Sequence, residues 1–130
     1  MIGIVTGKIS NLAVIDVDSK DERDIPSAFE GYENIPTVST PRGFHFYFAY
    51  QDGITNTVNI GGKKIDIRGE GGYVVAPPSK TDNGNQYRWE FSLIDGLPKF
   101  PTEILSEPKP ISALPAPQEG TFVELSLIHI

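Results

Sequence analysis

The sequence predicts an α+β domain with a mostly antiparallel sheet and few, short helices. Thirteen glycines and eleven prolines favour many strands and turns over long helices. Apolar runs rich in β-branched or aromatic residues recur along the chain and are bounded by turn residues. The order is strand, helix, then mainly strands, which is typical of an α+β domain.

The composition is typical of one soluble, intracellular domain. With 38% hydrophobic and 22% charged residues, the 130-residue chain is long enough to bury a core but small for an enzyme with two substrates. No apolar run approaches the roughly 20 residues that cross a bilayer, and the N-terminus lacks signal-peptide features. The absence of cysteine excludes disulfides and thiolate metal sites and fits a reducing compartment. We therefore expect a cytoplasmic protein with no membrane partner.

The chain is acidic, with a formal net charge of −6. Surfaces built mainly to hold nucleic-acid phosphates collect Lys and Arg, so the charge argues against such a surface. Any contact with nucleic acid must therefore be local, or must depend on bound metal.

Two apolar runs open the chain, Ile2–Val5 and Leu12–Val17. The polar turn between them predicts a hairpin. This turn is similar to a phosphate-binding loop but does not satisfy the Walker A pattern. Its two glycines enclose three residues rather than four, and isoleucine follows its lysine where Ser or Thr is required.

The second run ends in two carboxylates separated by one residue. Because side chains alternate along a strand, Asp16 and Asp18 project from one surface while Ile15 and Val17 face the other. Two like charges so close repel each other unless a cation lies between them. Mg²⁺ and Mn²⁺ prefer carboxylate oxygens, so the pair indicates a metal site. The alternative is a strand that runs into a polar turn.

The segment 19–32 is polar and then mildly amphipathic. It predicts a short helix with a proline in its first turn and a glycine near its end. Four apolar side chains are spaced to cover one side of that helix. These are Ile25, Ala28, Phe29 and Tyr32. The expected role is packing rather than chemistry.

An aromatic strand is predicted over 44–50. Alternation places four aromatic rings on its core face. These are Phe44, Phe46, Phe48 and Tyr50. His45 then projects from the opposite face, directly after a turn that contains glycine.

A charged strand is predicted over 63–68. Asp66 and Arg68 share its polar face with a lysine, while two isoleucines point inward. Glycines follow, and further strands are predicted over 73–76 and within 86–91.

The carboxylate pair, the histidine and the third carboxylate beside an arginine form an ordered set. Two-metal phosphoryl transfer needs carboxylates that hold the ions, with His and Arg to bind the remaining phosphate charge. Each residue alone also has a bland interpretation. His45 can be an ordinary strand histidine, Asp66 can alternate into solvent, and Arg68 can form a routine ion pair with an aspartate.

Four stretches of the chain resemble a known family. They are GIVTG at 3–7, VIDVD at 14–18, TPRGFHFYF at 40–48 and IDIRGEGGYVVAPPS at 65–79. Their order, wording and spacing resemble the bifunctional DNA primase/polymerase (prim-pol) domain of the archaeo-eukaryotic primase superfamily. Such domains occur in phages, plasmids and integrated elements, often fused to a helicase. The resemblance implies an RRM-like catalytic core, a metal-dependent nucleotidyltransferase of DNA replication.

The resemblance also implies a role for each matching residue. The catalytic carboxylates that would bind Mg²⁺ or Mn²⁺ are Asp16, Asp18 and Asp66. His45 matches the histidine expected to contact the phosphates of the incoming nucleotide. Arg68 and Arg42 are candidates for further phosphate contacts.

The resemblance covers about residues 2–100, and family members usually have a substantial portion before the first stretch. We therefore expect a prim-pol core over 1–105 that lacks this N-terminal portion, and a proline-rich linker with an apolar tail over 106–130. Expected partners are nucleoside triphosphates and a single-stranded DNA template or primer-template. A helicase, or the missing portion supplied in trans, is a further expected partner.

Two other functions remain open. The chain can be a non-catalytic remnant that binds nucleotide or a partner. It can also be a metal-dependent phosphodiesterase or nuclease, because carboxylates with a histidine serve hydrolysis as well.

Overall fold

The computed structural model describes residues 1–32, 34–91 and 96–106. Their secondary structure consists of short strands and 3-10 helices. The strands are β1 (Ile2–Val5), β2 (Leu12–Val17), β3 (Thr37–Ser39), β4 (Phe44–Ala49), β5 (Ile65–Arg68), β6 (Tyr73–Ala76) and β7 (Arg88–Phe91). The 3-10 helices are η1 (Glu22–Asp24), η2 (Ser27–Phe29), η3 (Ile60–Gly62) and η4 (Thr102–Ser106). The prediction of a mostly antiparallel sheet with few, short helices is confirmed.

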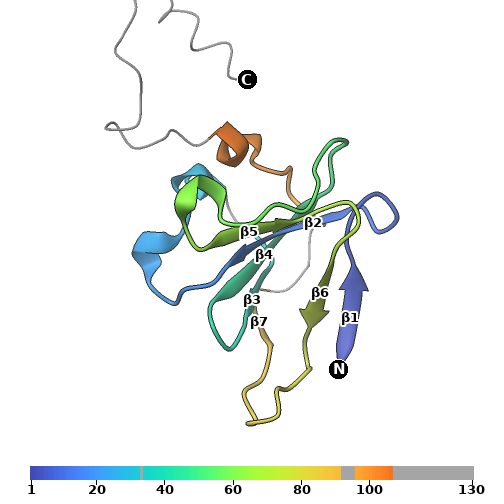
Figure 1. Ribbon diagram of the computed structural model, residues 1–130, viewed down its shortest axis with the longest axis vertical. Coiled ribbons are helices and arrows are strands. Elements are labelled where there is room, and N and C mark those ends of the chain that lie inside the picture. Colours follow the sequence, from blue (N-terminus) through green and yellow to red (C-terminus); the bar gives the residue numbers. More distant parts are fainter. Residues whose placement is uncertain (33, 92–95, 107–130) are drawn as a thin grey trace, which may run out of the picture.

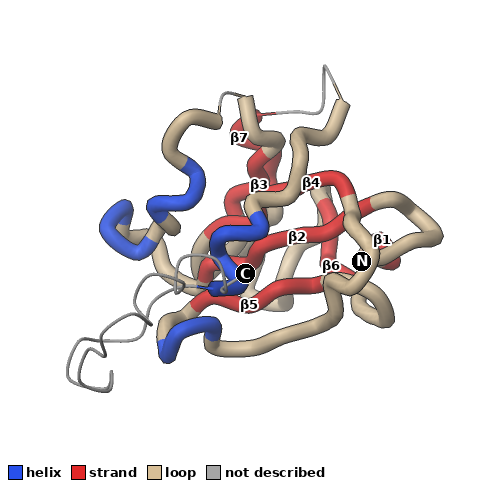
Figure 2. Tube along the Cα trace, turned by 90° about the horizontal axis from the view of Figure 1, so that it is seen from above, coloured by secondary structure: helices blue, strands red, loops and turns tan. Residues whose placement is uncertain are grey.

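The larger sheet has five strands in the order β5-β2-β4-β3-β7 (Figure 2). Every neighbouring pair of strands is antiparallel. Its register aligns one residue from each strand in a single row. Across the sheet this row is Asp66, Asp16, His45, Val38 and Trp89. Registered partners in an antiparallel pair point to the same face, so the two carboxylates and the imidazole are placed together by the sheet itself.

The predicted hairpin between the first two strands is wrong. β1 pairs with β6 in a separate two-stranded sheet, and a single bridge joins Gly7 to Leu12 where the chain passes from one sheet to the other. The reason is that β2 is a central strand, with β4 on one edge and β5 on the other. No edge of β2 is left for β1.

The apolar residues form two clusters, one on each face of the larger sheet. The 3-10 helices lie on one side of this sheet, and β1 and β6 lie on the other (Figure 1). On the helical side, Phe46 and Phe48 of β4 pack against Phe29 with ring centroids 4.7 and 5.4 Å away. The predicted core face of this strand is therefore confirmed. The opposite cluster includes Val14, Tyr47 and Val74 of β6.

The helix predicted within 19–32 is instead two 3-10 turns, η1 and η2. Asp21 caps η1 by accepting a hydrogen bond from the Arg23 backbone N–H at 2.9 Å. Pro26 separates the two turns because proline has no N–H to donate and disfavours helical backbone in the residue before it. The predicted packing nevertheless holds, since Phe29 is buried and Ile25 packs against the same cluster.

No helix in the described part of the chain has the length and apolarity needed to cross a membrane. Apart from Ser106, the linker and tail predicted over 106–130 lie outside the described residues.

Candidate active site

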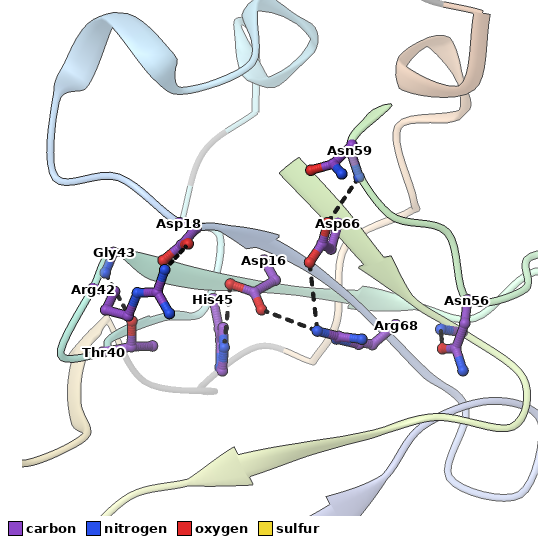
Figure 3. Close-up of polar contacts among 11 residues, drawn as sticks. Asp16, Asp18, Thr40, Arg42, Gly43, His45, Asn56, Asn59, Asp66 and Arg68 are labelled. Carbon is purple, nitrogen blue, oxygen red and sulfur yellow. Dashed lines mark hydrogen bonds and ion pairs between the residues drawn. The ribbon is translucent and has the colours of Figure 1, made fainter. Parts of the chain in front are cut away.

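The site lies on the face of the larger sheet that carries β1 and β6, opposite the aromatic core. Asp16 on β2 is the registered partner of both His45 on β4 and Asp66 on β5 (Figure 3). The local cause is alternation, because Ile15, Val17 and the phenylalanines of β4 fill the other face. Like charges directly opposite each other on neighbouring strands destabilise the pair. The two carboxylates therefore require a nearby cation.

Arg68 supplies that cation in the structure. It lies two residues after Asp66 on β5 and so shares its face. Its Nη2 is 3.5 Å from Asp66 Oδ2 and 3.7 Å from Asp16 Oδ2. Asp66 also accepts a hydrogen bond at Oδ1 from the Asn59 backbone N–H, at 2.9 Å. One guanidinium thus lies between two carboxylates, as Figure 3 shows.

The imidazole of His45 forms the wall on the other side of Asp16. Its side chain is 8% exposed, and Nε2 is 3.6 Å from Asp16 Oδ1. Nδ1 is buried and has no hydrogen-bond partner among the described residues. The ring of Tyr87 lies with its centroid 6.1 Å from that of His45. Burial, and then the charge of Asp16, raise the pKa of the Tyr87 phenol.

Asp18 has a different partner from the other two carboxylates. It lies just beyond the end of β2, where its Oδ2 is 2.7 Å from Nη2 of Arg42 in the turn between β3 and β4. That turn is closed by Thr40, whose Oγ1 accepts the Gly43 N–H at 2.9 Å. Lys20 also donates to the Gly43 carbonyl at 3.0 Å. Asp18 and Arg42 therefore form an exposed ion pair at the rim of the site.

Two adjoining cavities of about 330 and 320 Å³ open at this face. Four residues line both of them, and they are Asp16, His45, Arg68 and Tyr87. The larger cavity extends toward Asn56 and Tyr73 of β6. All six predicted site residues line the smaller one. They are Asp16, Asp18, Arg42, His45, Asp66 and Arg68.

The loop after β5 borders the larger cavity and is held by the first stretch of the chain. Thr6 is buried, its backbone N–H donates to the Gly72 carbonyl at 3.0 Å, and its hydroxyl donates to the Gly69 carbonyl at 2.6 Å. Asn56 Oδ1 accepts the Gly69 N–H at 3.1 Å. The GIVTG stretch at 3–7 thus contributes a structural anchor for the wall of the site.

Several lining residues were missed by sequence reasoning. Tyr87, Thr81 and Asn56 come from loops, whose path no periodicity describes. Tyr87 had one usable signal, because it alternates with Trp89 and Phe91 along the predicted last strand. The other two had none.

The donor chemistry fits a divalent cation, although the side chains are not arranged around one. Among the described residues, no three His, Asp or Glu side chains are close enough together to hold an ion as they stand. Asp16 and Asp66 are adjacent and offer carboxylate oxygens, the ligands that Mg²⁺ and Mn²⁺ prefer. Two arginines form ion pairs with the carboxylates instead. Arg68 pairs with Asp16 and Asp66, and Arg42 pairs with Asp18.

Comparison with protein families identifies the chain. The family model described as "Bifunctional DNA primase/polymerase, N-terminal" matches residues 1–116. The chain belongs to this family. Prim-pol proteins generally bind nucleotides and DNA and generally depend on divalent metal. No curated protein and no solved structure matches the chain.

Proposed function

We propose that this prim-pol chain carries the nucleotidyl-transfer site of a DNA primase/polymerase. In the reaction, a 3′-hydroxyl attacks the α-phosphorus of a nucleoside triphosphate, the new phosphodiester bond forms, and pyrophosphate leaves. One observation carries the proposal. All six residues singled out from the sequence line a single cavity of about 320 Å³, and three of them are neighbours in one row of the sheet.

Asp16, Asp66 and Asp18 are the proposed carboxylate ligands of Mg²⁺ or Mn²⁺. When bound, the ions would supply charge neutralisation at the triphosphate and a more acidic 3′-hydroxyl. The chain itself contributes placement. Because Asp16 and Asp66 lie on paired strands, the sheet fixes their backbones relative to each other before any ligand arrives.

His45, Arg68 and Arg42 are the proposed triphosphate ligands. They surround the carboxylates on three sides, with His45 on β4, Arg68 on β5 and Arg42 in the turn after β3. Positive or hydrogen-bonding groups in these places would orient the phosphates and stabilise charge as pyrophosphate leaves. The imidazole of His45 is the most buried of the three, since its side chain is 8% exposed, against 33% for Arg68 and 80% for Arg42.

Further features belong to the same proposal. The expected template is single-stranded DNA or a primer-template, with a helicase as a partner. We also propose the RRM-like arrangement of the core, its extent over 1–105, and a cytoplasmic location. The acidic net charge of −6 supports a template contact that is local or assisted by metal.

Binding measurements test the metal site. Asp16→Asn and Asp66→Asn keep the size of each side chain and remove its charge. We expect each variant to weaken Mn²⁺-dependent dATP binding by at least about tenfold in calorimetry, because a carboxylate ligand is lost. The matched control is Asp52→Asn, an exposed aspartate in the turn after β4. Unchanged affinity in both site variants would contradict the proposal.

Primer extension tests the reaction. Labelled DNA incubated with Mn²⁺ and dNTPs should lengthen, and Asp66→Asn should abolish the lengthening. Shortening of the DNA without dNTPs would instead identify a nuclease. Nucleotide binding without extension on any template would identify a non-catalytic remnant.

A further inference from the structure

Arg68 occupies the position between the two paired carboxylates, where a divalent cation is expected. We propose that Arg68 is a resident counter-ion of Asp16 and Asp66, and that it leaves them for the triphosphate when they take up a divalent cation. This inference rests on the proposed function and adds regulation to it. Metal and nucleotide would then bind cooperatively, because the same guanidinium serves first the carboxylates and then the phosphates.

The charges of the site require such an exchange. Asp16 and Asp66 bring two negative charges, and Arg68 returns one positive charge, which leaves a net negative charge where a polyanionic triphosphate must bind. A divalent cation on the carboxylates would cancel their charge completely. The positive charge of the guanidinium would then be available to the triphosphate, because the carboxylates would no longer neutralise it.

The contacts of Arg68 are loose enough to be exchanged. Its Nη2 lies 3.5 and 3.7 Å from the carboxylate oxygens, whereas the ion pair of Arg42 and Asp18 is 2.7 Å long. Charge-assisted N–H···O bonds are usually 2.7–2.9 Å, about the length of the Arg42 contact. Arg68 therefore neutralises its partners through space, without a short bond to either.

Arg68 also has space to move. Its side chain is 33% exposed, and it lines both cavities at this face. In Figure 3 its guanidinium points along the sheet toward Asp16 rather than into the core. Movement away from the carboxylates therefore requires a change of side-chain rotamer and no change in the sheet.

Cooperativity follows from linkage. If divalent cation and triphosphate each bind more tightly when Arg68 has left the carboxylates, each must increase the affinity of the other by the same factor. Without metal, Arg68 would stay with the two carboxylates and the site would keep a net negative charge, so a nucleotide would bind weakly. Metal without nucleotide would have to displace a resident cation.

Mn²⁺ binding without nucleotide tests the proposal. The variants are Arg68→Met, which removes the charge, and Arg68→Lys, which keeps it, with Arg88→Met on the exposed edge strand β7 as the matched control. We expect Arg68→Met to bind Mn²⁺ about tenfold more tightly than wild type, because the competing cation is gone. Arg68→Lys and Arg88→Met should remain close to wild type. Equal or weaker Mn²⁺ binding by folded Arg68→Met would overturn the proposal.

A measurement on the wild-type chain covers the case in which Arg68→Met does not fold. The side-chain Nε–H signal of Arg68, assigned through Arg68→Lys, should shift in NMR spectra when Mg²⁺ is added alone and again when inorganic triphosphate follows. An unchanged signal while Mg²⁺ binds would overturn the proposal. In Asp16→Asn, the shift of the Arg68 signal on addition of Mg²⁺ should be lost. If no divalent cation binds to the wild-type chain at all, the proposed function fails. If Mg²⁺ binds and the Arg68 signal stays unchanged, only the exchange of Arg68 fails.

Discussion

At the residue scale, two polar groups on β4 are buried on the site side of the sheet without a hydrogen-bond partner among the described residues. They are Nδ1 of His45 and the hydroxyl of Tyr47. His45 lines both cavities of the site. Tyr47 packs edge-on against Trp89 with ring centroids 5.2 Å apart, within the second apolar cluster. Unlike His45, Tyr47 lines neither cavity of the site.

Replacing Tyr47 by phenylalanine should stabilise the fold. The substitution removes a buried hydroxyl that lacks a partner and keeps the ring that packs against Trp89. We expect the free energy of unfolding to rise by about 1 kcal/mol in urea denaturation, because an unsatisfied polar group costs about that much or more. Tyr50→Phe, in a half-buried position, should change it little. A destabilised Tyr47→Phe would reveal a hydrogen bond to the hydroxyl.

The same burial predicts a response to alkaline pH. Desolvation raises the pKa of Tyr47 to about 12 from its ordinary value of 10.0. The neutral phenol is favoured in the folded chain, so its contribution to stability is complete below about pH 10 and is lost as pH rises through about 12. Ultraviolet titration at about 295 nm should show one tyrosine that ionises near pH 12 or on unfolding. That step should be missing in Tyr47→Phe.

At the scale of elements, the turn between β3 and β4 is pressed against the end of β2. A Cβ atom on Gly43 would collide with the carbonyl oxygen of Val17 and lie 2.6 Å from the Ser19 nitrogen. Both obstacles are backbone atoms, which cannot move aside as a flexible side chain can. The close approach brings Arg42 within reach of Asp18. Glycine is therefore required here by space rather than by a positive φ.

Gly43→Ala should separate the turn from β2. We expect a loss of stability of about 1–3 kcal/mol, typical of overpacking, and weaker triphosphate binding because Arg42 is displaced. The control is Gly3→Ala on β1, where a Cβ would meet its nearest atoms at 3.6 and 3.8 Å, an ordinary contact. Thermal unfolding and nucleotide titration check both expectations. Equal stability of the two variants would show that the turn can move away from β2 without cost, and would contradict the expectation.

At the scale of the whole molecule, the two sheets are joined through Thr6. Its hydroxyl and N–H bind the two ends of the loop that follows β5, so the two-stranded sheet and the wall of the larger cavity are fixed together. This connection spans more than sixty residues of chain. It explains how a stretch without reactive side chains belongs to the pattern of the site.

Thr6→Val should loosen this connection. The substitution keeps the shape of the side chain and leaves the Gly69 carbonyl without its hydroxyl donor. We expect a loss of about 1–3 kcal/mol in unfolding free energy and faster amide hydrogen exchange in β1 and β6. Thr57→Val is the control, because its hydroxyl bond to Thr55 is exposed and 3.2 Å long. Similar exchange in the two variants would contradict the anchor.

The sequence determined by itself those features that depend on local alternation. Residues 44–50 predict a strand with one aromatic face because every second side chain is a large ring, and the structure confirms this prediction. The same alternation assigned Asp66 and Arg68 to one face of β5. Membership in the prim-pol family could also be predicted from the sequence, because four stretches carry the family's pattern. The match of the family model to residues 1–116 confirms it. The roles of the site residues stay predictions.

Only the tertiary structure decided which strands are neighbours and which charges meet. β1 and β2 are adjacent in sequence yet lie in different sheets. The reason is that β4 and β5, which are distant in sequence, pair with both edges of β2. Register then placed Asp66 beside Asp16. Arg68 meets both carboxylates because it shares the face of β5 with Asp66, and its Nη2 lies 3.5 Å from Asp66 and 3.7 Å from Asp16. A cation in this place offsets the repulsion between like charges on neighbouring strands.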